Sequence, residues 1–475
     1  MTSDELTRLS ISAAGALLTQ GDVGAVELTE AYLERIAATE QRLNAYVTVT
    51  VELAREHAGR ADRRRRTGED VSPLCGIPLG LKDLYDVQGV PTTAGSPLPR
   101  DRVASHDSTV AGRLVSAGAV LLGKQSTHEF AWGGTTNNPH FGPTRNPHDP
   151  TRIPGGSSGG SAASVAAGSC AGAFGTDTCG SVRIPAALSG CVGFKPTYGR
   201  ISLHRVVPLA PSLDHGGPLA RTVHDAALLY ATVAGFDPAD ARTLPLSVPG
   251  VISGLDSSVR GLRVGRLRGW YEQVLDPDVR AALDDAVTVL RDAGCVVTDI
   301  RTERRDAPVD EVFTAVAAEA VPWHWATFGR DATGYSPALA AALAAGPPDP
   351  EVAAAARENV AAEVMALVSA LGEVDVLLCA TVPMPAPEIG AERVVVDGHD
   401  LPIEWLLTRL TSIFDVSRLP ALSVPFGTSG TGLPTGVQVV GRHLDEATVL
   451  RVGHRLERFD LQQYGTDRRR AGARP

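Results

Sequence analysis

Hydrophobic residues recur at helical spacing near the start of the chain. Leu28, Tyr32 and Ile36 lie four residues apart, and no proline occurs between residues 6 and 61. Apolar positions at this spacing place one face of a helix against a core. The pattern predicts helices over most of residues 6–61, within an N-terminal helical region that spans 1–65.

After residue 70 the pattern changes to short apolar runs separated by glycine and proline. A helix is expected over 110–117, followed by a buried strand over 119–122. Residues 133–160 are rich in Gly, Pro, Asn, Ser and Thr, a composition that predicts a loop. Later strands are expected at 262–266, 296–300, 374–379, 421–424 and 436–440, and later helices at 162–167, 277–293 and 445–458.

Residues 313–371 are rich in alanine and follow a helical pattern. Pro322 is expected to interrupt these helices, and the Pro-Pro-Asp-Pro run at 347–350 to break them. The small-residue helix over 162–167 is expected to pack close to neighbouring backbone. No fixed-period repeat or long linker divides the chain. The alternation of elements predicts one large α/β domain with a helical insertion.

Composition narrows the class of function. The chain has 475 residues, of which 43% are hydrophobic and 21% are charged, which is ordinary for a globular protein. A chain of this length buries a large core without metals or disulfides. The net charge of -10 provides no overall field that attracts nucleic acid or an anionic membrane. We therefore expect no nucleic-acid partner and no membrane partner.

Targeting signals and cysteines point to the cytoplasm. The first ten residues lack a signal-peptide pattern, and no apolar run reaches the roughly 18 residues that span a bilayer. The six cysteines are scattered without a CxxC pair, as expected for reduced thiols. The spacings of Cys170, Cys179 and Cys191 fit no common zinc site, so no metal is expected.

The most unusual segment is Gly-Gly-Ser-Ser-Gly-Gly-Ser at 155–161. A phosphate-binding loop would need a lysine where Ser161 stands, and a dinucleotide fingerprint would need a preceding strand in place of Asn-Pro-His-Asp-Pro at 146–150. A nucleophile elbow fits the letters G-x-S-x-G but needs the same missing strand. A flexible linker is the remaining alternative.

Two other segments favour chemistry at this loop. Residues 175–183, Gly-Thr-Asp-Thr-Cys-Gly-Ser-Val-Arg, form a second small-residue turn, where backbone N–H groups can converge on an oxyanion. Upstream, Lys82 follows the apolar run 77–81, and burial lowers the pKa of a lysine toward that of a useful base. A structural alternative is that Lys82 pairs with Asp83. Taken together, the segments describe a serine nucleophile that is activated without histidine.

These segments resemble the amidase signature family. The similarity lies in Gly-Ile-Pro-Leu-Gly-Leu-Lys-Asp at 76–83, in the Gly-Gly-Ser-Ser segment and in Gly-Thr-Asp-x-x-Gly-Ser, and it extends to residues 138–147, 193–197, 421–425 and 432–438. The resemblance covers nearly the whole chain. It implies a mixed central β-sheet sandwiched by helices, with a catalytic signature core at 70–225 and a variable helical segment at 300–415 that shapes the substrate pocket.

The resemblance also implies a Ser–cis-Ser–Lys triad and no cofactor. The family pattern places the nucleophile at Ser181, the relay at Ser157 and the base at Lys82. The expected residues around them are the backbone N–H donors of an oxyanion hole (Thr178, Cys179, Gly180 and Ser181) and the orienting residues Ser158, Asp177 and Arg183. For Asp177 and Arg183, an ordinary ion pair is the alternative.

Two positions depart from the family pattern. Cys179 replaces the first glycine of the Gly-Gly-Ser run, where a Cβ narrows the pocket and penalises positive φ. We expect this substitution to be tolerated structurally. Asp-Val-Ser-Arg at 415–418 stands where many relatives have Asn and Gly, and we expect an altered pocket wall there.

The sequence thus predicts a hydrolase that cleaves amides, and also esters or carbamates, of small molecules, as a monomer or homodimer. The alternative is the A subunit of a tRNA-dependent glutamine amidotransferase, but no clear arginine-centred glutamine pocket occurs in 300–415. Trp323, Trp325 and Phe328 suggest an apolar or aryl acyl pocket, with plain core packing as the alternative.

Overall fold

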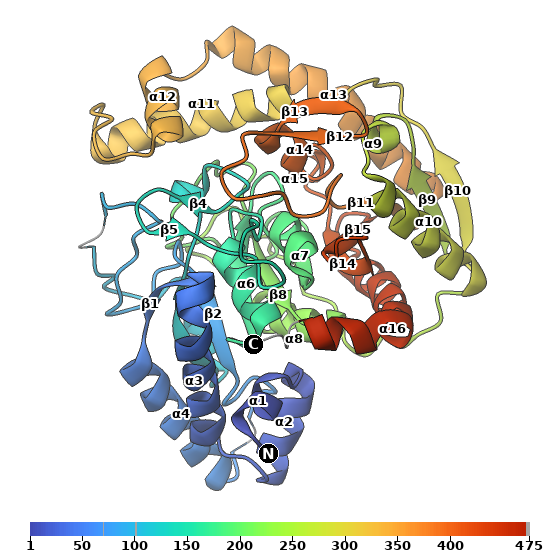
Figure 1. Ribbon diagram of the computed structural model, residues 1–475. Coiled ribbons are helices and arrows are strands. Elements are labelled where there is room, and N and C mark those ends of the chain that lie inside the picture. Colours follow the sequence, from blue (N-terminus) through green and yellow to red (C-terminus); the bar gives the residue numbers. More distant parts are fainter. Residues whose placement is uncertain (70, 100–101, 472–475) are drawn as a thin grey trace.

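The computed structural model describes residues 1–69, 71–99 and 102–471, and for 461–471 it describes the backbone alone. Within these residues the core is an eleven-stranded sheet (Figure 1). In sheet order its strands are β1 (Tyr46–Val49), β3 (Val120–Gln125), β2 (Pro78–Lys82), β6 (Gly172–Asp177), β8 (His215–Ala220), β7 (Val192–Lys195), β14 (Ala421–Thr428), β15 (Pro434–Gly441), β11 (Val376–Ala380), β9 (Arg263–Leu267) and β10 (Val296–Ile300). Parallel pairs flank a central block of antiparallel pairs, and the edge strand β1 is antiparallel to β3, so the sheet is mixed, as predicted.

Helices precede the first strand and connect most of the later ones. They are α1 (Ser3–Thr7), α2 (Ile11–Gln20), α3 (Ala25–Leu43), α4 (Val51–Arg66), α5 (Thr109–Ser116), α6 (Gly159–Ala167), α7 (Arg183–Ser189), α8 (Val223–Val233), α9 (Trp270–Gln273), α10 (Pro277–Asp292), α11 (Val309–Phe328), α12 (Pro337–Ala345), α13 (Pro350–Glu373), α14 (Ile403–Thr408), α15 (Ile413–Val416) and α16 (Glu446–Ala471). In Figure 1, α11 to α13 form an outer layer beyond the central elements. None of the helices in the described residues is long and apolar enough to cross a membrane.

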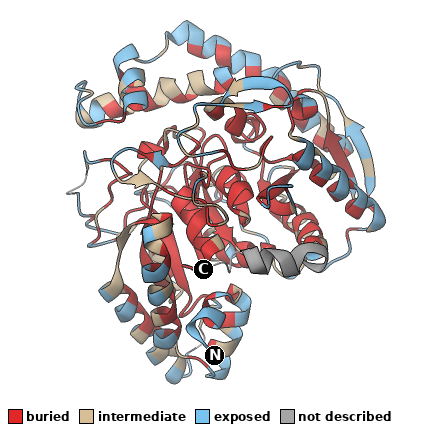
Figure 2. Cartoon of the chain, in the orientation of Figure 1, coloured by how far each residue is buried: buried red, intermediate tan, exposed pale blue. Residues whose placement is uncertain are grey.

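Helices cover both faces of the sheet. A Cβ on Gly453 of α16 would meet the side chain of Leu422 in β14. A Cβ on Gly436 of β15 would instead meet both Ser423, the next residue of β14, and Ala187 of α7. Because successive side chains of a strand point to opposite faces, α16 and α7 lie on opposite sides of β14. The predicted sandwich is confirmed, and the buried residues concentrate in these central elements (Figure 2).

Three local predictions are wrong. Residues 46–49, expected to be helical, form strand β1, because Tyr-Val-Thr-Val suits a strand and pairs with β3. The expected loop 133–160 contains the short paired strands β4 (Asn137–Asn138) and β5 (Gly142–Pro143). Pro322 lies inside the continuous helix α11 and does not interrupt it.

The fold gathers the sequence motifs at one edge of the sheet. Strands β2 and β6 are parallel neighbours, so their carboxyl ends, at Lys82 and Asp177, lie on the same edge. Helix α6 begins directly after Ser157 and Ser158, and α7 begins directly after the Ser181 loop. The two serine segments are therefore turns before buried helices, and Lys82 is the last residue of a buried strand.

The expected close packing of α6 occurs at its first turn. The Gly160 N–H donates a hydrogen bond to the Ser126 carbonyl at 3.0 Å. A Cβ on Gly160 would lie 2.5 Å from the Ala45 carbonyl oxygen and 2.5 Å from the Ser126 nitrogen. Both contacts are with backbone, which cannot move aside without shifting the sheet.

We predict that Gly160→Ala lowers the free energy of unfolding by about 1–3 kcal/mol, because the methyl group overpacks this contact. Urea denaturation measures the change. Gly372→Ala in the exposed part of α13 is the matched control, because no atom lies within 4 Å of its Cβ, and it should raise stability by about 0.5–1 kcal/mol. Equal effects of the two substitutions would contradict the packing argument.

Candidate active site

Lys82 lies at the end of β2 and is fully buried. Its Nζ donates hydrogen bonds to Ser157 Oγ at 2.7 Å and to Thr176 Oγ1 at 2.8 Å. The alternative pairing with Asp83 is wrong, because Asp83 Oδ1 accepts a hydrogen bond from Lys124 Nζ at 2.8 Å. The direct partners of the Lys82 ammonium are therefore two hydroxyl groups.

The environment of Lys82 favours its neutral form. Burial lowers its pKa to about 7, although the more distant carboxylates of Asp177 and Asp214 oppose the shift. A lysine with this pKa exists in both protonation states near neutral pH, as a general base requires. Sequence reasoning missed the second partner, Thr176, which immediately precedes the recognised aspartate in the small-residue turn.

The loop that carries Ser157 is fixed by backbone contacts. The Gly156–Ser157 peptide bond is cis. The Ser158 N–H donates to the Ser181 carbonyl at 3.2 Å, and the Ser158 hydroxyl donates to the Thr176 carbonyl at 3.2 Å. Ser158 thus joins the Ser157 loop to both the Ser181 turn and β6.

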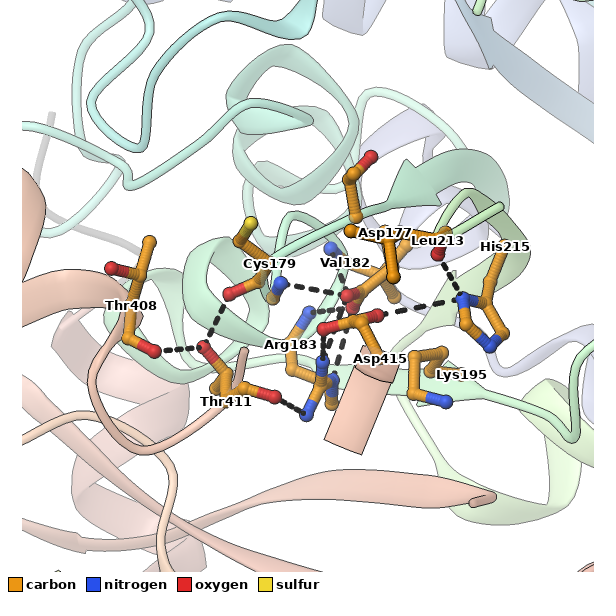
Figure 3. Close-up of polar contacts among 12 residues, drawn as sticks. Asp177, Cys179, Val182, Arg183, Lys195, Leu213, His215, Thr408, Thr411 and Asp415 are labelled. Carbon is orange, nitrogen blue, oxygen red and sulfur yellow. Dashed lines mark hydrogen bonds and ion pairs between the residues drawn. The ribbon is translucent and has the colours of Figure 1, made fainter. Parts of the chain in front are cut away.

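The Asp177 side chain is hydrogen-bonded to the backbone of the turn that carries Ser181. Its carboxylate accepts hydrogen bonds from the N–H groups of Gly180 at 2.7 Å, Val182 at 3.1 Å and Arg183 at 3.3 Å (Figure 3). The Gly180 N–H is therefore directed at Asp177, which corrects its assignment to the oxyanion hole. The N–H groups of Thr178, Cys179 and Ser181 are the other donors proposed for that role.

Arg183 and Asp177 form a fully buried ion pair, with Arg183 Nη2 2.8 Å from Asp177 Oδ1. Burial opposes ionisation of Asp177, but the adjacent guanidinium holds the pKa of that carboxyl well below its usual range. Because Asp177 also accepts hydrogen bonds from three loop N–H groups, the pair contacts the Ser181 turn in addition to forming an ion pair. It remains buried beneath the turn that carries Ser181.

The C-terminal segment closes the back of this turn. Arg183 also bonds to the Thr411 carbonyl at 3.1 Å and to Asp415 Oδ2 at 2.7 Å. The Thr411 hydroxyl donates to the Cys179 carbonyl at 2.6 Å. Asp415 is thus buried behind the turn and forms no pocket wall, whereas Val416 and Arg418 of the same segment line a second cavity. Figure 3 shows the convergence of these groups.

Cys179 fits the turn without adopting a left-handed backbone. The positive φ of +121° falls on Gly180, where a Cβ would collide with the Thr411 hydroxyl. Burial raises the pKa of the Cys179 thiol well above its usual value, and the nearby carboxylates of Asp415 and Asp177 add to this. The thiol therefore stays protonated, in agreement with a tolerated substitution.

Ser181 opens into a cavity of about 260 Å³. Its walls are mainly apolar. They consist of His128, Ala131, Trp132, Gly133, Gly134, Cys179, Ser181, Ile184, Leu209, Phe313, Val316, Ala338, Glu404 and Thr408. Among these described residues there is no lysine or arginine, and Glu404 is the only carboxylic acid.

The aromatic residues expected to form an aryl pocket lie elsewhere. Trp323 and Phe328 pack around Phe130, with ring centroids 6.2 Å and 5.5 Å from its ring. Trp325 stacks under the guanidinium of Arg330 at 4.2 Å. Core packing, the alternative interpretation, is correct for Trp323, Trp325 and Phe328, because all three pack partly buried against the main core. Sequence reasoning missed Trp132 and Phe313, the tryptophan and phenylalanine that do line the cavity, because no motif surrounds them.

Known proteins are similar to this chain in both sequence and fold. The A subunit of the glutamyl-tRNA(Gln) amidotransferase of Chloroflexus aurantiacus is 39% identical over 98% of this chain and 99% of its own length. A bacterial aryl acylamidase of the amidase signature family superposes with a TM-score of 0.90 at 27% identity, covering 98% of this chain and 99% of its own. The corresponding amidotransferase chain from Thermotoga maritima superposes with a TM-score of 0.77 at 31% identity, covering 96% of this chain and 94% of its own.

A further structure belongs to a vestigial protein complex that reveals the origins of an s-triazine catabolic enzyme. It superposes with a TM-score of 0.90 at 35% identity, covering 95% of this chain and 98% of its own. The family model described as Amidase matches residues 27–450. The chain is therefore a member of the amidase signature family.

Proposed function

We propose that this protein is a serine hydrolase that cleaves carboxylic amides with apolar acyl groups through an acyl-enzyme on Ser181. The observation that carries the proposal is the 2.7 Å contact between Lys82 and Ser157, beside a mainly apolar cavity that contains Ser181. A lysine with a pKa of about 7 is a suitable base for a hydroxyl relay. The same acyl chemistry extends to esters and carbamates.

The first half of the reaction forms the acyl-enzyme. Neutral Lys82 takes a proton from Ser157, Ser157 takes one from Ser181, and the Ser181 oxygen attacks the substrate carbonyl. The N–H groups of Thr178, Cys179 and Ser181 stabilise the oxyanion, and one such donor is typically worth about 3–4 kcal/mol of the barrier. The proton returns through Ser157 to the leaving nitrogen, so the amine departs neutral.

The second half releases the acid. Water gives up a proton through the same relay and attacks the acyl carbonyl, after which Ser181 recovers its proton. Ser158, Asp177 and Arg183 act as positioning residues in both halves, because their contacts hold the two serine loops against each other. They do not need to touch the substrate.

Sequence similarity favours a second candidate, the A subunit of a glutamyl-tRNA(Gln) amidotransferase, because one such protein is 39% identical over almost the full chain. In that role the chain would release ammonia from glutamine within a larger assembly. The cavity favours the first candidate, because its described lining has no lysine or arginine to pair with the carboxylate of glutamine. Burying an unpaired carboxylate is costly.

A substrate panel distinguishes the two candidates. We expect the purified chain alone to release amine from aryl amides of apolar acids, and to release little ammonia from glutamine. Liquid chromatography of the products measures both reactions. If glutamine were the only substrate that reacted, and if ammonia were released only after partner proteins were added, the amidotransferase function would be established instead.

We predict that Ser181→Ala abolishes turnover and that Lys82→Ala nearly does, because one removes the nucleophile and the other its base. A fluorophosphonate probe followed by peptide mapping should label Ser181 in the wild type and nothing in Ser181→Ala. The matched control is Ser212→Ala, a serine outside the lining of the Ser181 cavity, which should retain labelling and turnover. Full activity of Ser181→Ala would instead indicate Ser158 as nucleophile.

The pH dependence follows from the protonation of Lys82. A base must be neutral, and burial lowers the Lys82 pKa to about 7. For a neutral substrate, kcat/KM should therefore rise about tenfold per pH unit below pH 7 and level off above it. Stopped-time assays in buffers of constant ionic strength measure this profile. A profile that stays flat through this range would show that Lys82 is not the base.

A further inference from the structure

Glu404 is the one carboxylic acid in the described lining of the cavity that contains Ser181. It lies on α14 and is partly buried. Its Oε2 accepts a hydrogen bond from the Gly134 N–H at 2.6 Å. No described residue donates a hydrogen bond to Oε1 or forms an ion pair with the carboxyl, so one oxygen is left for a ligand.

The groups around Glu404 do not supply a positive charge. Burial, with a smaller contribution from Lys82, lowers the pKa of His128 to about 4, so its imidazole is neutral. The Cys179 thiol remains protonated. The Thr408 hydroxyl donates to the Glu404 backbone carbonyl at 2.8 Å. The nearest arginine on the same segment, Arg409, donates instead to the carbonyls of Trp270 and Val274.

An unpaired carboxyl in an apolar cavity is costly in its ionised form, and burial raises the pKa of Glu404 to about 7. A cation placed against Oε1 would offset this cost. A primary ammonium suits the position, since it donates charge-assisted hydrogen bonds from a narrow group.

We propose that Glu404 determines substrate specificity by binding a primary ammonium group on the acyl part of the substrate, which makes ω-aminoacyl amides the preferred substrates. The proposal rests on the proposed amidase function, because it assumes that the acyl group enters the cavity beside Ser181. It narrows the substrate class from apolar acyl groups to apolar chains that end in an amine.

Matched pairs of substrates test the proposal. Each pair consists of an ω-aminoacyl para-nitroanilide and the alkanoyl para-nitroanilide in which a methyl group replaces the ammonium, over a series of chain lengths. The readout is the ratio of the two kcat/KM values. We expect the ratio at the best chain length to favour the amine roughly ten- to hundred-fold, as for a hydrogen bond to a charged group.

Glu404→Gln is the decisive variant. Glutamine keeps a carbonyl oxygen for the Gly134 N–H and removes the charge, so the wall is preserved while the ammonium loses its partner. The preference for the amine should disappear, with hydrolysis of the alkanoyl substrate retained. Glu392→Gln removes the same charge from an exposed position before β12 (Arg393–Val396) and should leave the ratio unchanged.

The pH dependence of the ratio gives a second readout. Lys82 affects both members of a pair equally, so its titration cancels. The remaining ionisable groups of the lining, His128 and Cys179, stay neutral around pH 7. The preference for the amine should therefore increase as pH rises through about 7, where Glu404 ionises, and this increase should be absent in Glu404→Gln.

The outcomes separate this inference from the proposed function. If neither anilide is hydrolysed at any chain length, the amidase proposal itself fails. If both are hydrolysed but the ratio is near one, or is the same in Glu404→Gln as in the wild type, the role of Glu404 is refuted while the amidase function stands.

Discussion

The buried ion pair between Asp177 and Arg183 is the interaction on which the rest of the site depends. Two charges removed from water are costly unless every hydrogen-bonding atom finds a partner. Here the carboxylate is satisfied by loop N–H groups as well as by the guanidinium, and the guanidinium reaches onward to Thr411 and Asp415. The electrostatic requirement of one pair thus fixes the backbone around Ser181 and joins two distant parts of the chain.

The contrast between two buried lysines supports the choice of Lys82 as the proposed base. Lys124 and Lys82 lie on neighbouring parallel strands, and both are almost completely buried. Lys124 is paired with Asp83, which stabilises its charge. Lys82 has only hydroxyl partners, so burial lowers its pKa and its neutral form becomes accessible. The aspartate next to Lys82 in sequence therefore serves a different lysine, because strand alternation turns adjacent side chains to opposite faces.

The residues with local sequence signatures could be predicted from the sequence. Glycine and serine runs mark turns, and the apolar strand before Lys82 marks burial, so Lys82, Ser157 and the Ser181 turn were identified as one group. Strand β1 was not, since four residues between two helices carry too short a pattern to override their surroundings. The mixed sheet was expected only from the family resemblance, because pairing between remote strands leaves no local signal.

Residues without motifs were the ones that sequence reasoning missed. Thr411 and Glu404 act through contacts with segments more than two hundred positions away, at Cys179 and Gly134. Trp323 and Phe328 illustrate the opposite error, because an aromatic cluster in a helix has the same composition whether it packs in the core or lines a pocket. The two cases differ only in whether the aromatic face of the helix is oriented toward the core or toward the pocket.

The site divides into two parts that meet at residues 408–411. Lys82, Ser157 and Ser181 are held by β2, β6 and the turns before α6 and α7, whereas Phe313, Val316, Ala338, Glu404 and Thr408 contribute cavity wall from α11, α12 and α14. Thr408 and Thr411 link the parts, because the Thr411 hydroxyl is bonded to the Cys179 carbonyl and lies 3.3 Å from that of Thr408. We expect that wall residues that make none of these bonds can change without disturbing the proposed relay. Glu404 is such a residue, since its only side-chain bond in the described chain is to Gly134, on the wall itself.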